Sequence, residues 1–137
     1  MSGMFGIFGG MSAASQAEME TATSNTVGVT PLNANWHPGV AKAWLKCGVT
    51  GNILSSHNIT SITDQGTGIL DVTIATDFSS TAYIILSKAD SASFVFVSTS
   101  ITSGIQGVGS FRMNCFGSFT TYADPSSCWY IVCFGDQ

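Results

Sequence analysis

Residues 57–78 read HNITSITDQGTGILDVTIATDF, and this stretch decides the fold class. In its second half Leu70, Val72 and Ile74 alternate with polar residues, which is the period expected of a strand with one buried face. The turn residues DQGTG separate this run from the β-branched run HNITSIT. Because Asp and Gly between two such runs favour a tight reversal of the chain, the stretch predicts an antiparallel hairpin.

The rest of the chain after residue 40 has the same character. In AKAWLKC, residues 41–47, small and apolar residues alternate with Lys42, Trp44 and Lys46. About seven short strands are expected, with turns at the spacing typical of an antiparallel sandwich. They are predicted at 41–47, 57–63, 69–78, 81–88, 93–99, 111–119 and 128–135, with 101–110 as a glycine-rich strand or bulged loop. We therefore expect a mainly β protein built on a jelly-roll-like antiparallel β-sandwich.

Three of these segments, 81–88, 93–99 and 128–135, carry apolar residues at consecutive positions. Such strands are expected to be covered on both faces, whereas a sandwich covers only one face of each sheet. Charged residues make up 9% of the 137 residues, against about 25% in an ordinary domain. Both observations predict that copies of the chain cover one another.

Charge and the N-terminal stretch exclude several classes of partner. The formal net charge is −4, with only four basic residues, and binding a polyanion needs several cations on one face. The first residues, MSGMFGIFGGMSAAS, lack the basic residue and the continuous apolar core of a secretory signal, and they are too short to span a bilayer. We expect no nucleic-acid binding and no membrane insertion.

The residues that bind metals are not grouped in the sequence. Cys128 and Cys133 are five positions apart in one strand, so their side chains are expected on opposite faces. With Cys47 and Cys115 they are interpreted as free thiols in a reducing cytoplasm. Neither cysteines nor histidines show the paired spacing of a zinc site. No metal and no cofactor are predicted.

Catalytic patterns are also missing from the sequence. There is no G-x-S-x-G nucleophile elbow. Five aspartates are candidates for the paired carboxylates of a glycosidase by residue type only. Four of them lie in or beside expected turns, where Asp has a conformational role, and one lies on the polar face of a strand; they are Asp64, Asp77, Asp90, Asp124 and Asp71. The sequence therefore predicts no enzyme and no catalytic residue.

The segment before the strands contains one expected helix, residues 13–20, with its acidic residues toward the C-terminal end, where the helix dipole disfavours them. The segment ASQAEMETATSNTVGVTPLN resembles the pattern A-[ST]-x-A-E-x-x-x-[AG]-T-x-x-x-x-x-V-T-P of tail fibres of tailed bacteriophages and prophages. The matching residues are Ala14, Ser15, Ala17, Glu18, Ala22, Thr23, Val29, Thr30 and Pro31. HPGVAKAW, NITSITDQGTG and the closing FGDQ are similar to the C-terminal β-domains of such proteins, whereas Ala22 stands where Gly is common.

The resemblance implies a homotrimeric virion appendage, assembled in the host cytoplasm and present in the virion, with its N-terminal side fixed to the particle. Residues 1–12 would anchor it to a tail protein or to a portal or head-proximal protein, through the apolar residues Met4, Phe5, Ile7 and Phe8 between glycines. Residues 13–40 would form a trimeric connector and residues 41–137 a knob. In the connector, Ala14, Ala17 and Met19 would pack between chains, and Val29 would lead an extended segment to Pro31.

Receptor contacts are expected in loops of the knob. The candidate loop contains Phe119, Tyr122 and Asp124, an aromatic surface with a hydrogen-bonding acid that suits a host-surface glycan or protein. Trp44 is a candidate for stacking on a sugar or for a subunit interface, and the interface is favoured because aromatic residues are enriched there.

Three alternatives remain open at this stage. The chain could be a head or tail protein that decorates or stabilises the particle without binding a receptor. It could be a free lectin-like carbohydrate-binding module, in which case the N-terminal segment would be dispensable. A depolymerase-type enzyme is the third alternative, and it would shorten a host polysaccharide.

Overall fold

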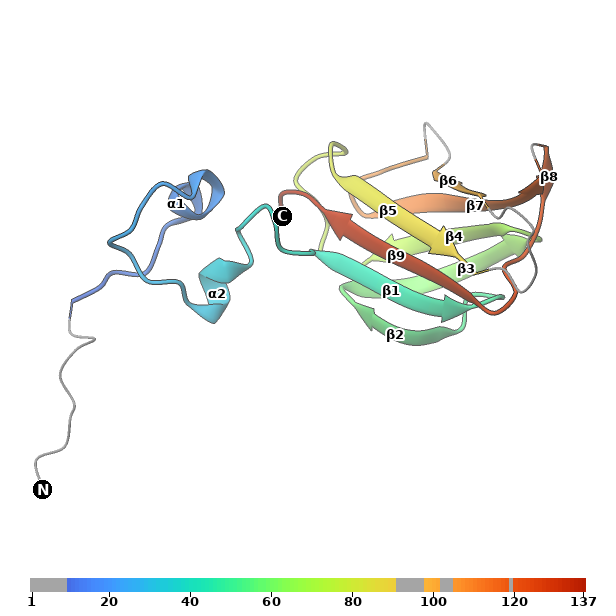
Figure 1. Cartoon of the computed structure of the whole chain (residues 1–137), viewed down its shortest axis with the longest axis horizontal. Helices are drawn as coiled ribbons and strands as arrows, with labels where there is room; N and C mark the ends of the chain where they lie inside the picture. Colours follow the sequence, from blue (N-terminus) through green and yellow to red (C-terminus); the bar gives the residue numbers. More distant parts are fainter. Residues whose placement is uncertain (1–9, 91–97, 102–104, 119) are drawn as a thin grey trace, which may run out of the picture. The chain divides into compact units, whose positions relative to one another are not determined.

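The computed structural model describes residues 10–90, 98–101, 105–118 and 120–137. The chain forms two compact units, Met1–Val40 and Ala41–Gln137. The first contains two short helices and the second contains the strands (Figure 1). Each unit is described separately below.

The N-terminal unit begins with helix α1, Gln16–Thr21. The expected helix 13–20 is shifted, because Ser15 forms a capping box with Glu18: each side chain accepts a hydrogen bond from the other residue's backbone N–H. Glu18 therefore lies in the first turn, where the helix dipole favours an acid. The expectation that the acids lie at the unfavourable end was wrong for this residue.

A second short helix, α2, Pro31–Ala34, was not expected. Thr30 caps it through the backbone N–H of Asn33, and Pro31 occupies the first turn, where its missing N–H costs no hydrogen bond. The segment 23–29 was expected to lead an extended chain into a stop at Pro31. Instead Pro31 begins a helix. The φ that the proline ring fixes is compatible with the first position of a helix as well as with an extended chain.

The second unit is mainly β. Its strands are β1 Ala43–Gly48, β2 Ile53–His57, β3 Ile59–Gly66, β4 Ile69–Ile74, β5 Ile84–Ala89, β6 Ser98–Ile101, β7 Ser110–Ser118, β8 Thr121–Tyr122 and β9 Cys128–Phe134. Two of these, β2 and β8, were not predicted. Burial within β2 does not alternate, so its sequence carries no period-two signal.

The strands form two antiparallel sheets, one in the order β2-β1-β9-β5 and one in the order β3-β4-β7-β6, with β8 paired to β7. In Figure 1 the first sheet lies in front of the second. The two sheets enclose one buried core to which each contributes alternate residues. From the first sheet come Leu45, Cys47, Trp129, Ile131 and Cys133, and from the second Leu70, Val72, Phe111, Met113 and Cys115. The prediction of an antiparallel sandwich is confirmed at this level.

The predicted hairpin is present as β3 and β4, paired from Ile59 opposite Ile74 to Gly66 opposite Ile69. Gly68 lies in the turn between the two strands and has a φ of +70°, which L-residues rarely adopt. A Cβ at this position would lie 2.6 Å from the carbonyl oxygen of Cys115 on β7. The glycine therefore allows the end of the hairpin to approach the neighbouring strand.

Strand β1 follows the predicted alternation from Ala43 onward, with Ala43, Leu45 and Cys47 buried and Trp44 exposed. Lys42 was expected on the exposed face with Trp44, but it is buried. The alternation does not extend to it, because β1 begins at Ala43 and the Lys42 N–H already bonds the carbonyl of Cys133 at the end of β9.

Candidate binding face

The outer face of the sheet β2-β1-β9-β5 carries a row of mostly apolar side chains. Strand pairing places His57, Trp44, Val132 and Leu86 side by side across all four strands. The Trp44 ring stacks against His57 with a centroid separation of 6.5 Å. On the side toward the end of β9, Ile84 lies opposite Phe134 and extends the apolar surface.

These side chains are open to solvent in the single chain. The exposed fractions are 61% for Ile84, 56% for Leu86, 39% for Trp44 and 38% for Tyr130. Strand β5 was expected to be covered on its second face by other copies of the chain, and within one chain that outer face is uncovered. Large side chains gathered on one sheet face are uncommon on a monomer and mark an interaction surface.

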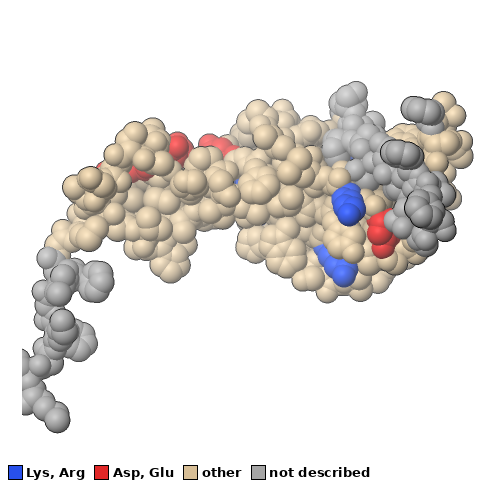
Figure 2. Space-filling view, viewed as in Figure 1, with Lys and Arg blue, Asp and Glu red and all other residues tan. Residues whose placement is uncertain are grey.

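The next row along the sheet is charged. Pairing places Tyr130 between Lys46 on β1 and Lys88 on β5. The Lys46 ammonium lies over the Tyr130 ring, 5.5 Å from its centroid, which is a cation–π contact. Neither lysine forms an ion pair with another of the residues that the structure describes. Figure 2 shows two basic groups and a neighbouring acidic group on this side of the sandwich, surrounded by uncharged side chains.

A shallow open groove of about 410 Å³ runs between these rows. Its wall is formed by side chains from β1, β9 and β5, and it is predominantly apolar. The side chains that line it on the outer face include Trp44, Lys46, Leu86, Lys88, Tyr130 and Val132. The hydrogen-bonding groups among these side chains are the ammonium groups of Lys46 and Lys88, the Tyr130 hydroxyl and the Trp44 indole N–H.

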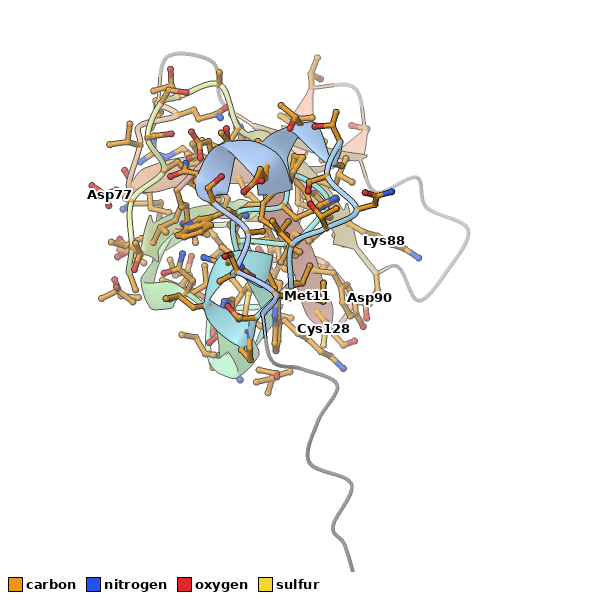
Figure 3. The ribbon with its side chains drawn as sticks, turned by 90° about the vertical axis from the view of Figure 1, so that its left-hand side faces the viewer. Met11, Asp77, Lys88, Asp90 and Cys128 are labelled. Carbon is orange, nitrogen blue, oxygen red and sulfur yellow. The ribbon has the colours of Figure 1, made fainter. Side chains whose placement is uncertain are left out.

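The charged border of the face continues at Asp90, directly after β5. Its carboxylate accepts hydrogen bonds from the Ser127 hydroxyl and from the backbone N–H groups of Ser127 and Cys128. These bonds, the Ser127 hydroxyl first, lower the pKa of Asp90 below its usual range. Figure 3 shows Lys88 and Asp90 on the side of the sandwich away from Asp77.

The outer face of the other sheet is polar by comparison. At its centre Arg112 on β7 forms a two-bond ion pair with Asp71 on β4, at 2.6 and 2.7 Å. The hydrogen bond from Arg112 lowers the pKa of Asp71. The side chains around the pair, such as Thr63 and Thr73, are exposed and uncharged. The two outer faces of the sandwich therefore differ in kind.

The predicted receptor loop is only partly a surface for ligands. Phe119 lies outside the described residues. Tyr122 is exposed, and its ring stacks on Phe116 at 4.7 Å. Asp124 accepts a hydrogen bond of 2.6 Å from the Gly68 N–H, so its carboxylate closes the turn after β3. Tyr122 therefore remains exposed, whereas the acid has a structural contact.

The predicted connector residues are not all available to neighbouring chains. Ala14 and Met19 are buried within the N-terminal unit by their own chain, whereas Ala17, Val29 and Pro31 are exposed. Sequence reasoning missed Asn33, which is buried and whose amide donates to the carbonyls of Ala14, at 3.0 Å, and Gly28, at 3.3 Å. An Asn after a Thr-Pro helix start was the only signal for it.

The anchoring residues Met4, Phe5, Ile7 and Phe8 lie outside the described residues. Among the described helices, none is both long enough and apolar enough to cross a membrane.

The four cysteines are free thiols. Burial raises the pKa of Cys47 and of Cys115 to about 11 and that of Cys133 to about 12. Cys128 is half-buried and its side chain lies on the face opposite to that of Cys133, as the strand period predicts. No group of three His, Cys, Asp or Glu side chains that could hold a metal ion occurs among the residues described.

The sequence did not reveal two features of this face. Its apolar side chains stay exposed, and Tyr130 has a lysine on each side. Trp44 was expected here, but Lys88 and Leu86 were not connected to it because they are about forty residues away in the sequence. Only the shared pairing to β9 brings them together. Comparisons of the chain with protein-family models, with curated proteins and with solved structures found no match.

Proposed function

We propose that this protein is a structural subunit of a bacteriophage virion: a short homotrimeric tail fibre or appendage. Its N-terminal residues attach to a tail protein or to a portal or head-proximal protein, and its jelly-roll-like knob binds a glycan or protein on the host surface. Three weak sites on one trimer, and several trimers on one particle, give firm attachment without a tight single site.

The observation that carries the proposal is the position of the fibre-like residues in the N-terminal unit. Ser15 and Glu18 form the capping box of α1, and Thr30 and Pro31 begin α2. Ala22, at the position where the fibre pattern often has Gly, ends α1 with a φ of 51°, in the left-handed region that favours Gly. The residues that match the fibre pattern thus begin and end the two helices of this unit, which supports reading the match as structural.

The test uses the purified full chain and the phage that encodes it. Host cells are incubated with the free protein and then challenged with phage, and an antibody against the chain is applied to intact particles. We expect labelled particles and reduced adsorption, with heat-unfolded protein as the control. Labelling without reduced adsorption would indicate a decoration protein, and binding to cells without labelling would indicate a free lectin-like module. The absence of both effects would contradict the proposal.

A further inference from the structure

We infer that the outer face of the sheet β2-β1-β9-β5 is an interface between copies of this chain, with strand β5 of one copy packed on the same sheet of the next. The inference rests on the proposed homotrimer and assigns its interface to a surface of the knob. The surface consists of the apolar rows around Trp44, Val132, Leu86 and Ile84, bordered by Lys46, Tyr130 and Lys88.

The size of the apolar surface fits an interface between proteins. If a fully exposed large side chain offers roughly 200 Å², the exposed fractions of Ile84, Leu86, Trp44 and Tyr130 add up to on the order of 400 Å². A stable interface covers about 800 Å² on each partner, with an apolar centre and a polar border. The four side chains supply about half of that area, and Val132, Phe134 and the lysine stems lie around them.

The shape of the face allows it to meet its own copy. The edge strand β5 carries the two most exposed of these side chains, Ile84 and Leu86, and so forms a ridge. The groove beside it lies over β9, between β1 and β5, and has a mainly apolar wall that includes Trp44 and Tyr130. A ridge and a groove on one surface let each copy insert into the next, and a repeated contact of this kind can close into a ring.

The charges at the border also favour a second copy. Lys88 and Asp90 lie two residues apart at the end of β5, so each chain brings both signs to the same border. Neither Lys46 nor Lys88 is paired with an acid among the described residues. A neighbouring copy, from a chain of net charge −4, can supply the missing carboxylates.

The experiment compares two double variants of the full chain by size exclusion with light scattering over a range of concentrations. Ile84→Glu with Leu86→Glu places two acids on the proposed interface, at positions exposed in the single chain. Thr63→Glu with Thr73→Glu places two acids on the outer face of the other sheet, also at exposed strand positions. Both add the same charge, and the thermal transition of each is recorded to verify folding.

We expect the wild type and the Thr63/Thr73 variant to have the mass of a trimer and the Ile84/Leu86 variant to have the mass of one chain. A trimer that survives Ile84→Glu with Leu86→Glu would overturn the inference and leave the proposed trimer standing, held by another segment. A wild type that is monomeric at every concentration would overturn both. If the double variant loses its thermal transition, the single change Leu86→Lys is measured in the same way and decides by the same masses.

Discussion

A single backbone angle at Ala22 explains why the fibre pattern that the surrounding residues resemble commonly has Gly at this position. Its φ of 51° is strained for a residue with a Cβ and free for glycine. We expect Ala22→Gly to stabilise the end of α1 by about 0.5–1 kcal/mol, because the release of strain exceeds the entropy that glycine adds to the unfolded chain. Amide exchange of Met19 and Ala22, whose N–H groups bond Ser15 and Glu18, should slow accordingly.

The matched control is Ala17→Gly, the same chemical change inside the same helix. Ala17 has ordinary helical geometry and an exposed side chain, so glycine should destabilise the helix there by about 0.5–1 kcal/mol. Equal effects at both positions would contradict the argument from φ.

Asp90 provides a second test at the scale of one residue, because its pKa is lowered by three hydrogen bonds. A carboxyl group whose folded pKa is lowered stabilises the fold above its unfolded pKa, and this contribution is lost as the pH falls through the folded value. We expect Asp90→Ala to lower the free energy of unfolding at pH 7 by about 1 kcal/mol. The difference from wild type should shrink as the pH falls below about 4, near the unfolded pKa.

The measurement is thermal unfolding of both proteins across pH 2 to 7. Asp64→Ala is the control, since the Asp64 side chain accepts a single hydrogen bond, from the Gly66 N–H at 2.9 Å. Its effect should be smaller. A difference between Asp90→Ala and wild type that stays constant down to pH 2 would rule out the carboxylate as its source.

At the scale of elements, the sequence predicted what alternation controls. The hairpin of β3 and β4 and the buried face of β7 follow directly from residues of period two. Strand β2 was missed because Ile53 and Leu54 are consecutive and both exposed, so a sheet edge leaves no alternation to detect. The start of α1 was misplaced because a capping box, not apolar periodicity, sets it.

Asn33 tests whether one buried amide holds the two helices of the N-terminal unit. Asn33→Asp keeps the side-chain oxygen that accepts from Thr30 N–H but replaces the amide group that donates to Ala14 and Gly28 with a second oxygen. A buried carboxylate whose second oxygen faces the carbonyl oxygens of Ala14 and Gly28, with no hydrogen between them, should cost about 1–3 kcal/mol. We expect the amides of Ala14 and Gly28 to exchange roughly tenfold faster or more.

The sandwich serves as an internal reference in the same experiment. The Cys115 N–H, which bonds Gly68 at 2.8 Å, belongs to the other unit and should keep its wild-type rate. Asn25→Asp, at an exposed position, is the control for the added charge. Faster exchange at Cys115 in the Asn33 variant would mean that the two units do not unfold independently.

For the whole molecule, the proposed trimer needs a surface at which its copies meet. The connector was expected to hold the trimer through Ala14, Ala17 and Met19, but its own chain already buries Ala14 and Met19. The uncovered apolar side chains lie instead on the sandwich, on the outer face of one sheet. Composition and strands that are apolar on both faces predicted association between copies. The strand order shows which of these side chains stay uncovered in a single chain.

This shift leads to a prediction about a shortened chain that begins at His37 and keeps the whole unit Ala41–Gln137. If the sheet face supplies the symmetry, the shortened chain still forms trimers, because Ile84, Leu86 and Trp44 are all retained. If the connector adds a second contact between copies, the sheet face and the connector act together in the full chain. The shortened trimer then dissociates at a higher protein concentration than the full-length trimer. Light scattering across a dilution series measures both masses. If the full chain is trimeric and the shortened chain is monomeric at every concentration, the trimer depends on residues before His37. The sheet face would then not be an interface between copies.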